Sequence, residues 1–424
     1  MAHLLVVESW VGSMGRLPPR AVADRGHRFT FLTRDLDHYL RSTAPGEGPH
    51  PLLTAENVLT AETNDPSTLL PYVERLHAAL EFDGAVSSCD YYLPTVAAVA
   101  EHLGLPGPRA DAVLAACRKD LTRDRLAAAG IPGPRFALCR GLAEALAAAR
   151  EIGYPLVVKP VDLCAGMYVR QVADERELSD AHLALADFPV NARGQRREPS
   201  VLLEELLTGR EVSVETVSFD GEVRVIGVTG KTIGGAPAFV ETGHLFPADL
   251  EPAPAEAAAD TAVAALKALG LDQVVAQTEL KLTPHGPRIV EVNPRPAGNR
   301  ITELVRRVTG VDLAAACVDV ALGRRPELTP RRTDAASAAI AFLLPDRDGR
   351  LTAVDGADTV RRDPAVVELA LAAPGREVRR AVSNNEYLGH VMTIDPDGSR
   401  ADRTAEHLRS QLTPCYEQRS AVPA

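Results

Sequence analysis

Short apolar runs alternate with helical patterns along the first quarter of the chain. The runs HLLVV, RFTFLT and GAVSS have the length and the β-branched or aromatic content of buried strands, and residues 94–103 show helical spacing. Strands that alternate with helices are typical of a parallel sheet. We therefore expect residues 1–110 to form an α/β domain built on a parallel sheet.

The pattern changes after this domain. Residues 111–200 combine helical spacing with short strands such as LVVKP, which predicts a small αβ unit. From 201 to 330, polar and apolar residues alternate as in an antiparallel meander, and the remainder, 331–424, is mixed α/β. The helices predicted in the middle of the chain lie near 111–118, 120–129, 141–152, 174–186 and 254–269.

A hairpin that carries acidic and amide side chains closes the β-rich part. QTEL and RIVEVN read as two strands joined by the turn TPHGP. Because side chains alternate along a strand, we expect Ile289, Glu291 and Asn293 on one face. Val290 is expected on the opposite face. Glu279 on the first strand would then face Glu291, and the two like charges need a positive group between them, for which oxygen ligands suit magnesium or manganese.

Composition and charge exclude several classes of protein. The chain has 424 residues, 46% hydrophobic and 24% charged, and it contains no apolar run of about 20 residues and no signal peptide pattern. Its six cysteines are scattered without a CxxC pair, which argues for free thiols in the cytoplasm and against zinc or disulfides. A net charge of −11 without a basic stripe argues against a nucleic-acid partner. We expect a cytoplasmic protein that acts on small molecules without a membrane partner.

Lysine is rare in this chain. Arginine carries most of the positive charge, so we expect each lysine to be placed for its compact ammonium, with composition drift as the alternative. Of 46 basic residues the lysines are Lys119, Lys159, Lys231, Lys267 and Lys281.

Lys159 ends an apolar strand in LVVKP. A lysine buried there needs an anionic partner. The residues that follow, VDLCAGMYV, predict a tight turn in which Gly166 lets backbone amides approach a ligand. A lysine at the base of such a loop suits phosphate oxygens, and the alternative is an edge-strand lysine that reaches solvent. Lys119, at the start of a predicted helix, has the same two interpretations.

The stretch VLLEELLTGREVSVE offers a second candidate for nucleotide binding. An apolar strand ends at Glu204 and Glu205, and Glu211 follows Glu204 by seven residues. Extended backbone after a strand can supply the donor and the acceptor that the adenine edge needs, and a later carboxylate can accept both ribose hydroxyls. An acidic loop that faces solvent is the alternative.

These pieces occur in one order along residues 80–325, and in that order the sequence resembles the ATP-grasp superfamily. Within it the sequence is most similar to the carboxylate–amine ligases, especially the L-amino acid ligases that make dipeptides. The resemblance rests on CRKDLTRDRLAAAGIPGP, LVVKPVD, LLEELLTGREVSVE, FVETGHLFPADL and EVNPRPAGNRI. It implies an α/β (α+β) ATP-grasp fold with a Rossmann-like N-terminal domain, a small lid and a larger antiparallel-sheet domain. It also implies ATP and Mg²⁺ or Mn²⁺ as cofactors.

The resemblance implies a role for each matching residue. Phosphates, the adenine hinge and the ribose are assigned to Lys119, Lys159, Gly166, Glu204, Glu205, Leu207 and Glu211. The implied metal ligands are Glu279, Glu291 and Asn293. The substrate-binding set has Asp90 near the amine of an amino acid, Glu241 in the pocket, His244 near the transferred phosphoryl group and Arg295 at the acyl phosphate. Arg295 and His244 are the candidate catalytic residues.

Two positions depart from the family's pattern. The phosphate loop DLCAGM has one glycine where many relatives have a glycine-rich run, so we expect its closure to differ. Asn299 stands where some relatives have a bulky residue that narrows the acceptor pocket. We expect Asn299 to shape that pocket; the alternative is that it caps a helix beginning near residue 300.

The predicted activity is ATP-dependent ligation. A carboxylate, expected from an amino acid, is phosphorylated to an acyl phosphate and coupled to an amine, with release of ADP and phosphate. Asp90, Glu241 and His244 all stay open as acceptors of the amine's proton. A bicarbonate-dependent carboxylase and a purine-pathway ligase are alternatives, and an ATP-binding protein without turnover is disfavoured by the three metal ligands. A homodimer is compatible with the resemblance.

Overall fold

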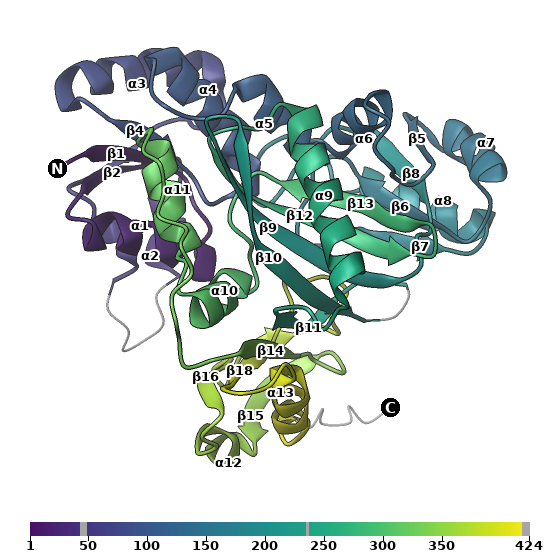
Figure 1. Cartoon of the computed structure of the whole chain (residues 1–424). Helices are drawn as coiled ribbons and strands as arrows, with labels where there is room; N and C mark the ends of the chain where they lie inside the picture. Colours follow the sequence, from purple (N-terminus) through teal and green to yellow (C-terminus); the bar gives the residue numbers. More distant parts are fainter. Residues whose placement is uncertain (43–48, 235–236, 418–424) are drawn as a thin grey trace, which may run out of the picture.

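The chain is described by a computed structural model over residues 1–42, 49–234 and 237–417. Within these residues the strands form four sheets, and helices pack against them (Figure 1). The N-terminal sheet is parallel, whereas the other sheets are built from antiparallel pairs. This arrangement confirms the predicted fold class. In the described part of the chain, no helix combines the length and the apolar content that a membrane crossing needs.

The N-terminal sheet has the strand order β3-β2-β1-β4, and all of its pairs are parallel. Trp10 and Asp90 lie after the carboxyl ends of β1 and β4. Loops at this edge of a parallel sheet are the ones that usually contact ligands. The elements are β1 (His3–Val7), α1 (Ser13–Asp24), β2 (Arg28–Thr33), α2 (Leu36–Leu40), β3 (Asn57–Thr60), α3 (Pro66–Leu80), β4 (Gly84–Val86) and α4 (Leu93–Leu103).

Two helices and a small sheet follow, and the sheet lies on the right of Figure 1. The sheet has the order β5-β8-β6-β7, and its buried face packs on two helices through residues such as Ala145, Leu156 and Leu178. We call it the lid sheet. The elements are α5 (Ala110–Cys117), α6 (Lys119–Ala128), β5 (Phe136–Cys139), α7 (Leu142–Ile152), β6 (Leu156–Pro160), β7 (Arg170–Val172), α8 (Glu175–Ala186) and β8 (Val201–Glu205).

The largest sheet has eight strands in the order β13-β12-β9-β10-β11-β14-β18-β16. Helix α9 covers one face through apolar residues such as Ala262, Leu266 and Leu269, which pack against Leu280 and Val214. The elements of the catalytic part are β9 (Arg210–Phe219), β10 (Glu222–Ile233), β11 (Glu241–Phe246), α9 (Pro252–Leu269), β12 (Val274–Thr283), β13 (Gly286–Asn293), α10 (Ile301–Thr309) and α11 (Leu313–Ala321).

The C-terminal segment extends this sheet. Strand β14 pairs with β11, so the sheet runs without a break from the catalytic part into the C-terminal part. A small sheet, β17-β15-β19, lies beyond it. The elements are β14 (Ser337–Leu343), β15 (Gly349–Asp355), α12 (Ala357–Arg361), β16 (Val366–Leu371), β17 (Glu377–Val378), β18 (Gly389–Asp395), α13 (Ala401–Ser410) and β19 (Thr413–Tyr416).

Some elements pack against a unit other than the one to which the sequence assigns them. Strand β8, at 201–205, belongs to the lid sheet, and α11 packs on the N-terminal sheet, where Ala314 and Val318 meet Leu4 and Val6. Shared cores of this kind bring the loops of different units to one place. The residue limits of the four predicted units stay a prediction, and the last of them runs past the described residues.

A β-bulge changes the predicted faces of β13. Glu279 pairs with Glu291, but Leu280 pairs with Ile289, so Val290 is an extra residue on β13. Ile289 consequently packs in the buried core with Leu280, whereas Val290 and Glu291 both line the cleft described below. The expectation that Ile289 shares the face of Glu291 was wrong, because strict alternation fails where a bulge inserts a residue.

Candidate active site

A cleft with a volume of about 470 Å³ lies where the N-terminal loops, the lid sheet, the large sheet and the C-terminal segment meet. Most of the residues singled out in the sequence line it, namely Asp90, Lys159, Gly166, Glu204, Glu205, Leu207, Glu211, Glu241, Glu279, Glu291, Asn293, Arg295 and Asn299. Lys119 lines a neighbouring cavity of about 170 Å³ that shares Glu291 and Asn293 with the cleft. His244 is buried behind Glu241.

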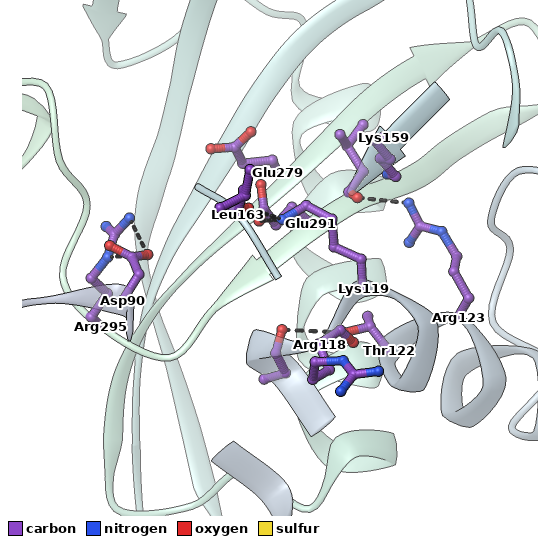
Figure 2. A network of polar contacts seen from close by, with 12 residues as sticks. Asp90, Arg118, Lys119, Thr122, Arg123, Lys159, Leu163, Glu279, Glu291 and Arg295 are labelled. Carbon is purple, nitrogen blue, oxygen red and sulfur yellow. Dashed lines mark hydrogen bonds and ion pairs between the residues drawn. The ribbon is translucent and has the colours of Figure 1, made fainter. Parts of the chain in front are cut away.

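Glu279 and Glu291 are direct cross-strand partners on β12 and β13. A positive group stands beside each of them, as the sequence required. The Lys231 ammonium lies 2.8 Å from Glu279, and the Lys119 ammonium lies 2.7 Å from Glu291. Figure 2 shows Lys119 reaching from α6 toward Glu291. Each carboxylate therefore has its own cation, and the repulsion between the two acids is reduced without being removed.

The two acids differ in their electrostatics. Burial opposes the ionisation of Glu291, but Lys119 outweighs burial and holds the pKa of Glu291 below its ordinary value. Burial raises the pKa of Glu279 to about 7, and the carboxylates of Glu241, Glu291 and Glu211 add to that rise against the attraction of Lys231. Negative charge at Glu279 is thus incompletely balanced by the protein.

The chemistry of this site fits a hard divalent cation. Two carboxylates face each other across the strands, and the amide side chains of Asn293 and Gln277 form the next cross-strand pair in the same cleft. Oxygen donors of this kind suit Mg²⁺. Across the described residues, no group of three or more His, Cys, Asp or Glu side chains is arranged as a metal site. The assignment of Glu279, Glu291 and Asn293 as metal ligands stays a prediction.

Lys231 was missed as a site residue. It lies on β10 with only 1% of its side-chain surface exposed, and its ammonium contacts Glu241 at 2.8 Å, Glu279 at 2.8 Å and Glu211 at 3.2 Å. Burial lowers its pKa, but the three carboxylates outweigh burial and raise the pKa well above the usual range. The rarity of lysine was the sequence signal that could have identified it.

Lys159 is the next-to-last residue of β6 and lines the cleft at the base of the phosphate loop. Its ammonium lies 2.7 Å from Glu204, and Arg123 donates to the other oxygen of that carboxylate at 2.6 Å. Burial lowers the pKa of Lys159 to about 8, with Arg123 adding to the effect, while Glu204 opposes it. The side chain of Glu204 therefore pairs with two cations of the lid, Lys159 and Arg123. We expect any hydrogen bond to adenine to come from the backbone that follows Glu204.

The hinge after β8 carries the other residues predicted for the nucleoside. Leu206 and Leu207 line the cleft, and Glu205 pairs with Arg135 at 2.8 Å near the surface. Glu211 accepts contacts from Lys281 at 3.0 Å and from Lys231. The ribose role predicted for Glu211 stays a prediction, and its carboxylate already has two cationic partners.

The phosphate loop, residues 162–167, is held by left-handed backbone. Ala165 has φ +57° and Gly166 has φ +68°. A side chain on Gly166 would meet no atom within 4 Å, so the backbone conformation and not space favours glycine there. Lys119 donates to the Leu163 carbonyl at 2.7 Å and so joins the loop to Glu291.

Asp90 and Arg295 form a half-buried pair that lines the cleft, seen to one side of the lysine and glutamate side chains in Figure 2. The guanidinium of Arg295 donates to Asp90 through Nε and lies 2.8 Å from it through Nη2. Trp10 donates its indole N–H to the other carboxylate oxygen at 2.8 Å. The Asp90 carboxylate thus contacts Arg295 and Trp10, and its expected place near the amine of an amino acid stays a prediction. Trp10 was not anticipated, because nothing local marks a loop tryptophan as a partner of residue 90.

Asn299 contacts Glu241. Its side-chain amide donates to the Glu241 carboxylate and lies 3.5 Å from the Tyr387 hydroxyl. Helix α10 begins at Ile301, and its cap residue is Arg300, which makes no side-chain capping bond. Asn299 has φ +47°, a conformation that asparagine tolerates better than most residues. The helix-cap alternative is therefore wrong, and Asn299 instead belongs to the wall around Glu241.

Glu241 and His244 are neighbours on β11. His244 Nε2 lies 3.2 Å from the Glu241 carboxylate, and its ring meets Phe342 edge-on at 5.5 Å. Burial would raise the pKa of Glu241, but Lys231 and His244 outweigh burial and hold it well below its ordinary value. The pair places a carboxylate and an imidazole side by side beneath the end of the cleft that contains Asn299.

Comparison with known families supports the interpretation of the motifs along most of the chain. Residues 21–107 match the ATP-grasp N-terminal domain, and residues 152–303 match the ATP-grasp domain. Residues 341–417 match the L-amino acid ligase C-terminal domain 2. The three matches follow the order of the sheets, and the last of them falls on the segment that extends the large sheet.

Individual relatives agree with these matches. An uncharacterized protein of Sinorhizobium fredii is 32% identical over 363 residues, which span 84% of this chain and 74% of that protein. Alanine–anticapsin ligase of Bacillus subtilis strain 168 is 26% identical over 415 residues, 89% of this chain and 85% of the enzyme. The crystal structure of an L-amino acid ligase from Bacillus licheniformis has the same fold, with a TM-score of 0.80, 23% identity and 99% of each chain covered.

Proposed function

We propose that this chain, which belongs to the ATP-grasp superfamily of ATP-dependent C–N ligases, activates the carboxylate of an amino acid and joins it to the amine of a second one. The observation that carries the proposal is the cleft itself, which is lined by Lys159, by Arg295 and by the Glu279–Glu291 pair with its two lysine partners behind it. An amino acid is preferred because the C-terminal segment matches an L-amino acid ligase domain and a relative joins alanine to anticapsin.

The nucleotide end supplies positive charge for a triphosphate. Lys159 lies on the strand that precedes the phosphate loop, and Lys119 donates to the Leu163 carbonyl within the loop. Both lysines are buried, so their charges act in a site with little screening. Glu279, Glu291 and Asn293 would hold Mg²⁺, which would supply positive charge to neutralise the phosphates, and Mn²⁺ has the same ligand preferences. Positioning and neutralisation are what phosphoryl transfer chiefly needs from a protein.

The substrate end stabilises the acyl phosphate and receives the amine. Arg295 is fixed by Asp90, so its guanidinium is oriented before substrate arrives. The carboxylate of Asp90 is committed to Arg295 and Trp10, which makes it a poor acceptor for the amine's proton. The Glu241–His244 pair lies beside Asn299. We propose that the imidazole of His244 takes the proton, while Glu241, held ionised by Lys231, orients the ring.

Other ATP-grasp activities are the competing candidates, because one fold supports many chemistries. A screen for phosphate release with ATP and magnesium separates them. Amino acids are added singly and in pairs, and bicarbonate is added in parallel. We expect ADP and phosphate to form with a pair of amino acids. Release that needs bicarbonate, and is indifferent to amino acids, would overturn the proposal. A cytoplasmic location and a homodimer are part of the same proposal, and size-exclusion chromatography tests the second.

A further inference from the structure

A five-residue segment of the C-terminal part, Ser383–Tyr387 with the sequence SNNEY, reaches back to the cleft. We call it the clasp. Ser383 donates to the Glu386 carboxylate through both its backbone amide and its hydroxyl, each at 2.8 Å, so the turn is closed internally. The Tyr387 ring stacks on Phe342 at 4.2 Å, which fixes the other end of the turn against β14.

The clasp contacts two other parts of the site. The Asn384 backbone amide donates to the Ala165 carbonyl in the phosphate loop at 3.1 Å. The Asn384 side-chain oxygen accepts from the Glu241 backbone amide at 2.9 Å. The Tyr387 hydroxyl donates to the Glu241 carbonyl at 3.0 Å. Both backbone groups of Glu241 and one carbonyl of the phosphate loop are therefore held by the same five residues.

The contact with Ala165 matters because of its conformation. Ala165 has φ +57°, a left-handed conformation that costs free energy for a residue with a β-carbon and persists only where the surroundings hold it. The loop has one glycine, so it depends on such support more than a glycine-rich loop would. Asn384 is a source of this support that lies outside the lid sheet and the catalytic strands.

We propose that the clasp is a positioning element that holds the phosphate loop over β11, so that Asn384 and Tyr387 keep the acyl phosphate from water until the amine attacks. The inference rests on the proposed function for its chemical consequence. Its structural part does not, because the contacts exist in the free protein. Exclusion of water from a reactive acyl phosphate prevents its hydrolysis to the starting carboxylate and phosphate.

Hydrogen exchange of the free protein tests the structural part. Asn384→Leu keeps a side chain of similar size and removes the acceptor for the Glu241 amide, whereas Asn384→Asp keeps an acceptor. We expect exchange at the Glu241 amide to rise about fivefold in Asn384→Leu, the factor for a typical lost hydrogen bond, and to stay near wild type in Asn384→Asp. The amide at position 384, which donates to Ala165, should also exchange faster in Asn384→Leu, because the clasp has lost one of its anchors. Asn57→Leu, which loses a side-chain bond to Thr30 in the N-terminal sheet, is the matched control.

The ratio of amide to ADP tests the chemical part, with the amino acid pair that the phosphate screen identifies. Wild type and Asn57→Leu should form about one amide per ADP, and Asn384→Leu should form measurably more ADP than amide. Tyr387→Phe, which keeps the ring stack, should show a smaller excess and tests the clasp even if Asn384→Leu does not fold. Unchanged hydrogen exchange and an unchanged ratio of amide to ADP in the folded variants would overturn the role proposed for the clasp. A wild type that makes no amide would overturn the proposed function and leave the exchange result standing.

Discussion

Glu279 and Glu291 stand opposite each other on adjacent strands, and each carboxylate contacts a different buried lysine. Lys119 comes from the first residue of α6 and Lys231 from β10, so two distant parts of the chain neutralise one acidic pair. The sharing of Lys231 also affects how this site can bind a metal ion. Because Lys231 is shared among three carboxylates, it balances the charge of Glu279 incompletely and the pKa of Glu279 rises to about 7, so a cation bound beside Glu279 would favour its ionised form.

Replacement of Glu291 by Gln should leave the fold intact and lower turnover by at least about a hundredfold, because the metal loses a charged ligand. The same change frees Lys119 from its carboxylate partner. The measurement is the rate of ADP formation at increasing magnesium concentration, with Glu222→Gln at the surface as a control. Turnover near wild type at saturating magnesium would show that Glu291 does not hold the metal.

Replacement of Lys231 by Met should destabilise the protein by about 3–5 kcal/mol at pH 8, because three buried carboxylates lose their cation. Lys231 holds the pKa of Glu241 low, and this stability is present above the unfolded pKa and fades as the pH falls. The loss measured by urea unfolding should therefore be nearly the same at pH 5 as at pH 8 and should become smaller only as the pH falls below about 4.5. Lys267→Met on the exposed face of α9 should change stability by less than about 0.5 kcal/mol. An equal loss of stability in both variants would contradict the conclusion that Lys231 stabilises the three carboxylates.

The pKa of Lys159, lowered to about 8 by burial, predicts a pH dependence of ATP binding. The ammonium loses its proton as the pH rises through that value, so the KM for ATP should increase about tenfold between pH 7 and 9. The free energy of unfolding should change in the other direction. It should rise as the pH goes from about 8 to 10.5, because over this range the Lys159 side chain holds a proton in the unfolded chain and not in the folded one. Lys159→Arg, always charged, should flatten the KM profile. A KM that stays constant in wild type would contradict the role of Lys159.

Arg295→Ala should lower kcat by about 10²–10³ with every amine and leave the KM for ATP nearly unchanged, since the adenine hinge lies elsewhere. Asp90→Asn should lower kcat by about tenfold, because Arg295 keeps its charge and loses its orientation. Steady-state kinetics with several amines distinguish the two effects. If Asp90→Asn changes the choice of amine and not kcat, Asp90 binds the amine directly, as first predicted from the resemblance.

Asn299→Trp should narrow the range of amines, because a large side chain would enter the wall around Glu241. It should also lower stability by about 1 kcal/mol, since the left-handed backbone at this position disfavours bulky residues. Asn299→Gly suits that backbone and should widen the range of amines. Relative rates over a panel of amines give the test, and equal slowing of all amines by both variants would remove Asn299 from the acceptor pocket.

Much of this arrangement could be predicted from patterns that are local in sequence. The strand that ends at Lys159, the hinge after Glu204 and the register of Glu279 with Glu291 all follow from periodicity and motif spacing. The bulge at Val290 could not be predicted, because an inserted residue leaves no mark in an alternating strand. The same limit applies to the contacts between distant segments.

Trp10 and the clasp show that limit most clearly. Trp10 reaches Asp90 only because β1 and β4 are neighbours in the sheet, and Asn384 reaches Ala165 only because β14 continues the large sheet. Both depend on tertiary contacts that single-sequence patterns do not encode. Lys231 is an intermediate case, because composition marked lysine as unusual but could not say which carboxylates surround it.

Transfer of oxygen from the carboxylate to phosphate tests the central claim most directly. The carboxylate substrate is labelled with ¹⁸O in both oxygens, and the phosphate released during amide formation is analysed by mass spectrometry. If Lys159, the metal and Arg295 serve to make an acyl phosphate, each phosphate should carry one ¹⁸O atom and ADP should form in equal amount. Amide formation with unlabelled phosphate would contradict that account.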